Sequence, residues 1–145
     1  MKIAVVSGGF DPIHSGHIAY LNAASKLGDK LIVCLNSDVW LENKKEKYFL
    51  PFKERKIILE NLSMVSSVIG FKDDQFGSAI NGLKIVKKHY PDYEIIFCNG
   101  GDRDKENIPE MDLKNITFQF SVGGDDKKNS SSWILKKWTY PFTQR

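Results

Sequence analysis

The stretch "SGGFDPIHSGHIAYL", residues 7–21, holds two of the chain's three histidines, His14 and His17, separated by one serine and one glycine. It begins at the end of "KIAVVS" (2–7), a β-branched run that is typical of a buried strand. It leads into residues 15–28, where apolar side chains recur about every three residues, as on one face of a helix. The stretch therefore predicts a strand-to-helix turn that is rich in glycine and histidine, with Gly28 ending the helix.

Further apolar runs alternate with helical patterns along the chain. Strands are expected at 30–36, 63–71, 93–101 and 116–122, and helices around Arg55, over 80–90 and over 130–138. This alternation predicts an α/β fold, a Rossmann-like five-stranded, mostly parallel sheet with helices on both faces, formed by one domain over 1–145. Such sheets bind ligands at the carboxyl ends of their strands. That rule selects residues 8–17, 36–38, 99–103 and 123–132.

Composition narrows the class of protein. The formal net charge is only +3 over 145 residues, and no basic stripe with interleaved aromatic side chains occurs, so no nucleic-acid partner is expected. No apolar run is long enough for a membrane helix, so no membrane partner is expected either. Cys34 and Cys98 lie in apolar runs and are expected to be buried, reduced thiols of a cytoplasmic protein.

The glycine–histidine turn does not fit several known site patterns. It lacks the G-x-G-x-x-G of dinucleotide-binding turns, the G-x-x-x-x-G-K-[ST] of phosphate loops and the H-E-x-x-H of zinc proteases. His14 and His17 alone also provide too few ligands for a metal site. Two interpretations are left. One is a capped helix with two surface histidines; the other is a polyphosphate site made by glycine backbone, a helix N-terminus and two imidazoles. The strand-to-helix position favours the second.

The sequence resembles a known family at this point. "GGFDPIHSGH" (8–17) is similar to the G-x-F-D-x-x-H-x-G-H signature of the cytidylyltransferase-like nucleotidyltransferases. The resemblance covers most of the chain, because further segments match: "LGDKLIVCLNSD" (27–38), "PFKERKIILENLSMVSSV" (51–68), "NGGDR" (99–103) and "SSS" (130–132). Members of this family move a nucleoside monophosphate from an NTP to a phosphorylated acceptor and release pyrophosphate.

The resemblance implies roles for individual residues. The expected catalytic residues are His14 and His17, donating hydrogen bonds to the triphosphate, and Lys44 and Arg55, contacting phosphates or nucleotide. The expected nucleotide-binding residues are Gly8, Gly9, Phe10, Asp11, Gly16, Asp102, Arg103, Ser130, Ser131 and Ser132. No protein-held metal is expected, and Mg²⁺ is expected to arrive with the NTP.

Each of these roles has a simpler alternative. The lysines of "ENKKEKYFLPFKER" (42–55) also suit a solvated face beside a mobile loop, and Asp102 suits a turn. The serines also suit a helix N-cap. Asp11 is a candidate for orienting the acceptor or a metal. The serine element departs from the family pattern, because Asn129 stands where an aliphatic residue is usual and Ser132 where threonine is.

Two branches of the family compete for this sequence. The short chain resembles glycerol-3-phosphate cytidylyltransferase, which uses CTP, whereas "NSD" and "NGGD" resemble the nucleotidyltransferase domain of ADP-heptose synthase, which uses ATP. CTP and a phosphorylated polyol or sugar are the favoured substrates, and ATP with a sugar 1-phosphate is the alternative. The resemblance also implies a homodimer. The alternative that is not an enzyme is a nucleotide-binding module without catalytic activity.

Overall fold

Five strands form one sheet in the order β3-β2-β1-β4-β5, in a computed structural model that describes residues 1–100, 108–123 and 130–143. All four neighbouring pairs are parallel. The strands are β1 (Lys2–Gly8), β2 (Lys30–Leu35), β3 (Ser67–Gly70), β4 (Glu94–Cys98) and β5 (Ile116–Gln119). The predicted Rossmann-like α/β fold is confirmed.

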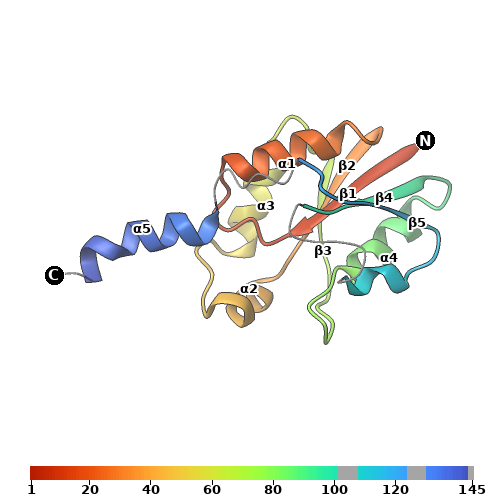
Figure 1. Cartoon of the computed structure of the whole chain (residues 1–145). Coiled ribbons are helices and arrows are strands. Elements are labelled where there is room, and N and C mark those ends of the chain that lie inside the picture. Colours follow the sequence, from red (N-terminus) through yellow and green to blue (C-terminus); the bar gives the residue numbers. More distant parts are fainter. Residues whose placement is uncertain (101–107, 124–129, 144–145) are drawn as a thin grey trace.

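Helices cover both faces of this sheet (Figure 1). Helices α1 (Ser15–Ser25) and α3 (Phe52–Glu60) lie on one face, and α4 (Ile80–His89) lies on the other. Successive strand side chains point to opposite faces, so β1 supplies both cores. Val6 packs in the core on the α1 side, and Val5 packs in the core on the α4 side.

The strand order places the functional edge of the sheet. The chain moves outward from β1 to β2 and β3, and then returns to the other side of β1 to form β4 and β5. The order therefore reverses between β1 and β4. In open parallel sheets, ligands bind at the carboxyl ends of the strands near this reversal. Gly8 and Cys98 end these two strands, so the turn before α1 lies where a ligand is expected.

A short helix, α2 (Asp38–Lys45), occupies part of the segment expected to be a loop. The Ser37 hydroxyl accepts the Trp40 N–H at 3.0 Å and caps its first turn. Leu41 is its only buried residue. The helix therefore shows no apolar repeat, which is the pattern from which the other helices were predicted.

Helix α1 ends at Ser25, and not at Gly28 as expected. Lys26 is its C-cap, with ordinary right-handed helical backbone. Gly28 has a different reason to be glycine, because a Cβ there would lie 2.6 Å from the Ala4 backbone nitrogen. The residue thus allows the chain to approach β1 closely as β2 begins.

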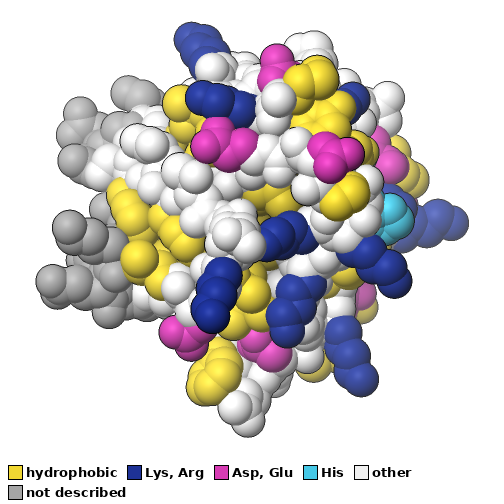
Figure 2. Space-filling model, turned by 90° about the vertical axis from the view of Figure 1, so that its right-hand side faces the viewer, with side chains coloured by type: hydrophobic (Ala, Val, Ile, Leu, Met, Phe, Trp, Pro, Cys, Tyr) yellow, Lys and Arg dark blue, Asp and Glu magenta, His cyan; other side chains and the backbone are white. Residues whose placement is uncertain are grey.

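The ends of the molecule differ in character. Helix α5 (Ser131–Thr143) extends away from the sheet, and a 3-10 turn, η1 (Pro109–Asp112), precedes β5 (Figure 1). The side that carries the N-terminus shows Lys and Arg interspersed with Asp and Glu around apolar groups (Figure 2). This side therefore has mixed charge. Among the residues described, no helix is long and apolar enough to cross a membrane.

Both cysteines are buried and free, as predicted. Cys34 belongs to the α4-side core and Cys98 to the α1-side core. Burial disfavours a thiolate and raises the pKa of each thiol to about 12. These thiols are therefore protonated core residues.

Candidate active site

The two motif histidines form the start of α1. The His14 ring accepts the Gly16 N–H at Nδ1 (3.0 Å), and the His14 N–H donates to His17 Nδ1 (3.2 Å). Their rings stack with centroids 3.8 Å apart. Both imidazoles thus lie at a helix N-terminus, where unpaired N–H groups and the helix dipole favour an anion.

The hydrogen bonds of the histidines fix their tautomers. Since Nδ1 accepts in each ring, the neutral form of each carries its proton on Nε2 and presents a donor there. Burial, followed by the charges of His14, Lys44 and Lys45, lowers the pKa of His17 from its ordinary 6.5 to about 3. His17 is therefore a neutral hydrogen-bond donor at neutral pH.

Phe10 supports His17 from the strand side of the turn. Its ring lies 4.9 Å from the His17 ring, and the residue is 5% exposed. Its φ of +50° is uncommon for a bulky residue and places strain at this turn. The turn before α1 is thus held in a specific shape around the imidazole.

Packing explains why positions 8 and 9 of the turn are glycine. A Cβ on Gly9 would lie 2.5 Å from Leu41 Cδ2, and one on Gly8 would lie 3.1 Å from the Phe10 ring. Gly9 therefore allows α2 to pack directly on the turn. The sequence suggested that these glycines admit a ligand, and the structure shows that they also admit α2 and the Phe10 ring.

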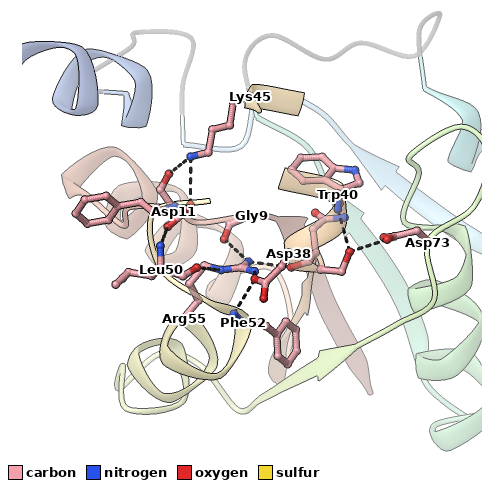
Figure 3. A network of polar contacts seen from close by, with 12 residues as sticks. Gly9, Asp11, Asp38, Trp40, Lys45, Leu50, Phe52, Arg55 and Asp73 are labelled. Atoms are coloured by element: carbon pink, nitrogen blue, oxygen red, sulfur yellow. Dashed lines mark hydrogen bonds and ion pairs between the residues drawn. The ribbon is translucent and has the colours of Figure 1, made fainter. Parts of the chain in front are cut away.

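Asp11 ties the turn to the segment that follows α2. Its carboxylate accepts the N–H groups of Phe49 (2.6 Å) and Leu50 (2.7 Å), and it lies 3.3 Å from the Lys45 ammonium group (Figure 3). The residue is 3% exposed. Its two oxygens are thus occupied by the protein. In this structure Asp11 fixes the loop, and the metal or acceptor contact suggested from the sequence stays a prediction.

Arg55 is buried, with 1% of its surface exposed. Its guanidinium donates to the carbonyl oxygens of Leu50, Gly9 and Asn36 at 2.8–2.9 Å and to Asp38 Oδ1 at 2.7 Å (Figure 3). The guanidinium is thus held by contacts within the protein, and the expected contact with nucleotide stays a prediction. Arg55 joins the turn after β1 to the end of β2 and acts on the site through their position.

The lysines of α2 divide into two environments. Lys44 lies over the Trp40 ring, 4.9 Å from its centroid. Lys45 donates to the Asp11 carbonyl and forms the ion pair with its carboxylate. Lys45 thus contacts the motif turn directly, while the charge of Lys44 also helps to lower the pKa of His17, and the catalytic role expected for Lys44 stays a prediction. Successive helix residues point about 100° apart, so this distinction required knowledge of α2.

The serine element lies against the histidine turn. The Ser131 hydroxyl donates to the Pro12 carbonyl at 2.8 Å, across 119 residues of sequence. Ser130 Oγ accepts the Trp133 N–H at 3.0 Å and lies 3.2 Å from Ser132 Oγ. The N-termini of α1 and α5 therefore meet at one place. Ser130 thus caps the first turn of α5, and Ser131 bonds to the turn that carries the histidines.

Two of the expected nucleotide-binding residues, Asp102 and Arg103, lie outside the described residues. Among the described residues, no group of three or more His, Cys, Asp or Glu side chains is arranged to hold a metal ion. Because the protein occupies both Asp11 oxygens, a carboxylate cage for Mg²⁺ does not fit this part of the chain. That Mg²⁺ arrives with the triphosphate stays a prediction.

The site combines imidazole donors with two helix N-termini, at the point where the strand order of a parallel sheet reverses. This combination is typical of α/β enzymes that bind nucleotides. Residues 5–132 match the family described as cytidylyltransferase-like. The bifunctional protein HldE of Blochmanniella floridana is 37% identical over 109 residues, which are 74% of this chain and 21% of that protein. The chain thus spans about a fifth of the length of the curated relatives it matches.

Solved structures share the fold. The lipopolysaccharide core biosynthesis protein of Thermoplasma volcanium GSS1 has a TM-score of 0.63 at 22% identity, over 83% of this chain and 94% of that one. A bifunctional NMN adenylyltransferase/ADP ribose pyrophosphatase of Francisella tularensis was solved with AMP and a manganese ion. It has a TM-score of 0.66 at 19% identity, over 96% of this chain and 42% of that one. The chain belongs to the cytidylyltransferase-like family.

Proposed function

We propose that this enzyme transfers a nucleoside monophosphate from an NTP to a phosphorylated small molecule and releases pyrophosphate. The observation that carries the proposal is the meeting of the stacked His14–His17 pair with the N-terminus of α5. Imidazole N–H donors, helix N–H groups and serine hydroxyls together suit the several oxygens of a triphosphate.

In the proposed reaction, an oxygen of the acceptor phosphate attacks the α-phosphorus in line. A bond forms between that oxygen and the phosphorus, while the bond to the bridging oxygen of the β-phosphate breaks and pyrophosphate leaves. The protein supplies position and charge stabilisation, and no covalent intermediate is needed. His14 and His17 would donate Nε2–H bonds as charge develops, and Lys45 or Lys44 would neutralise phosphate charge. Mg²⁺ would accompany the triphosphate.

Two donor nucleotides are candidates. CTP with a polyol phosphate is the pair that the sequence resemblance favoured. The HldE relatives favour the ADP-heptose branch, and therefore ATP with a sugar phosphate. The 37% identity with HldE extends over 109 residues of this chain. We therefore favour ATP as the donor over the CTP expected from the sequence. CTP is the second candidate.

Pyrophosphate release tests the function directly. The enzyme is incubated with Mg²⁺, ATP or CTP, and either a sugar 1-phosphate or glycerol 3-phosphate. Release that requires both nucleotide and acceptor is expected, with ATP and the sugar phosphate giving the highest rate. Release with CTP alone among the nucleotides would assign the protein to the cytidylyl branch. Absence of release and of binding with either nucleotide would contradict the proposal.

A further inference from the structure

Three polar residues end the α4-side face of the central strands: Ser7 of β1, Asn36 after β2 and Asn99 after β4. Each of them lies two residues after a core residue of this face, which is Val5, Cys34 or Phe97 respectively. The backbone stays sheet-like there, since the Asn36 N–H donates to the Gly8 carbonyl (2.9 Å) and the Asn99 N–H to the Gln119 carbonyl (2.8 Å). Strand alternation therefore directs all three side chains to the α4 side.

The register brings these residues together. β1 and β4 pair Val5 with Phe97, so the same register sets Ser7 opposite Asn99. β1 and β2 pair Ser7 with Cys34, which places Asn36 one step further along the same face. Neighbouring strands lie about 4.8 Å apart, so one small molecule can span the three side chains. They flank the reversal of strand order between β1 and β4.

Apart from one long Asn99 contact, the described part of the chain shows no hydrogen bond for the polar groups of these side chains. Asn99 is 1% exposed, and its Oδ1 has no hydrogen-bond partner. Its Nδ2 has only a long contact of 3.4 Å to the Phe97 carbonyl. Within the described part of the chain, no side-chain hydrogen bond of Ser7 or Asn36 is present. An unsatisfied buried polar group typically costs about 1–3 kcal/mol, so such a group calls for a functional explanation.

The position of these residues separates them from the histidine pair. His14 and His17 lie at the start of α1, which covers the opposite face of the sheet. In-line transfer requires the attacking oxygen and the leaving pyrophosphate on opposite sides of the α-phosphorus. If the triphosphate lies at the N-termini of α1 and α5, the α4 side of β1 is left for the acceptor.

We propose that Ser7, Asn36 and Asn99 bind hydroxyl groups of the acceptor. The acceptor is therefore a phosphate ester whose polyol or sugar part is uncharged. This inference rests on the transfer reaction proposed above. Amide and hydroxyl groups both donate and accept, as sugar hydroxyls do. Asp73, in the segment after β3, has one oxygen bound by the Ser37 hydroxyl at 2.6 Å and a second, buried oxygen without a partner. That oxygen suits a further hydroxyl donor.

The test compares Asn99→Leu with Asn61→Leu, a control at the exposed end of α3, well away from this edge of the sheet. Asn99→Leu is expected to raise the KM for the acceptor at least tenfold while the calorimetric Kd for the NTP changes less than twofold. Its thermal midpoint is expected to equal or exceed that of the wild type, because an unsatisfied group is removed. Asn61→Leu is expected to leave both substrate constants unchanged.

Opposite results overturn the inference. An acceptor KM within twofold of wild type together with a lowered midpoint would make Asn99 a structural residue, and a weakened NTP Kd would place it in the donor site. Faster transfer to an amino-alcohol phosphate than to polyol and sugar phosphates would exclude a hydroxyl subsite. In each case the wild type still transfers nucleotide. Failure of the wild type to bind NTP or release pyrophosphate would overturn the proposed function and this inference together.

Discussion

Arg55 Nη1 donates to the Gly9 carbonyl oxygen at 2.9 Å, which fixes the motif turn to a helix 46 residues further along the chain. The same nitrogen donates to the Asn36 carbonyl at 2.8 Å. One buried cation therefore sets the relative position of the ends of β1 and β2. The shape of the site therefore depends on this residue.

Replacing Arg55 is expected to destabilise the fold. Arg55→Met leaves three carbonyl oxygens and Asp38 without their donor, and breaking a buried ion pair typically costs about 3–5 kcal/mol. Asp38 is 31% exposed, so the lower part of that range is expected. Denaturant unfolding measures the loss. Lys53→Met, on the exposed side of the same helix, is the control, and an equal stability of the two variants would refute the role.

The two glycines of the turn should differ in their tolerance of alanine. Gly9→Ala places a Cβ 2.5 Å from Leu41 and should cost about 1–3 kcal/mol through overpacking. Gly8→Ala meets the Phe10 ring at 3.1 Å and should cost less. Urea unfolding of both variants measures the difference. A greater loss for Gly8→Ala would show that the packing of α2 on the turn is not limiting.

The bond from Ser131 to Pro12 should matter for nucleotide binding. Ser131→Ala removes a hydrogen bond worth about 1 kcal/mol and frees the N-terminus of α5 from the turn. An increase of about fivefold in the KM for the NTP is therefore expected from steady-state rates, by conversion of that energy. Ser131→Thr keeps the hydroxyl and should restore the wild-type value. Loss of activity in both variants alike would point to crowding at this position and not to the hydrogen bond.

His17 should make stability depend on pH. Its pKa is about 3 in the folded chain against an ordinary 6.5, so between these values the unfolded chain binds a proton that the folded chain does not. Stability is therefore retained above pH 6.5 and falls as the pH drops toward 3, by up to about 1.4 kcal/mol per pH unit.

His17→Asn removes this proton difference. The free energy of unfolding should then fall by about 2 kcal/mol less between pH 6.5 and pH 4.5 than it does in the wild type, because other groups titrate equally in both proteins. Urea unfolding at the two pH values measures it. Parallel losses in the two proteins would mean that His17 is not held neutral.

The strands and the histidine pair could be predicted from the sequence because both depend on residues that are close together in the chain. β1 and β2 are continuous apolar runs, and His14 and His17 sit one turn apart in a motif. The partners of Arg55 and Lys45 could not be found in this way. They depend on α2, a helix with a single buried residue, and on contacts between segments 34 and 46 residues apart.

The unpaired amide oxygen of Asn99 also could not be predicted from the sequence. Asparagine after a strand is common in turns, and nothing in "CNGGD" distinguishes a satisfied side chain from an unsatisfied one. Burial and the lack of a partner appear only in three dimensions. The serine element is intermediate, because its helix was predicted while its bond to Pro12 was not.

The central claim is that the histidine pair binds the triphosphate. Calorimetric titration of the wild type, His14→Ala/His17→Ala and the control Lys53→Ala with ATP and Mg²⁺ tests it most directly, with CTP as the second titrant. We predict that the wild type and Lys53→Ala bind one nucleotide with equal Kd, and that the double variant binds it at least tenfold more weakly. Equal affinity of the double variant and the wild type would contradict the claim.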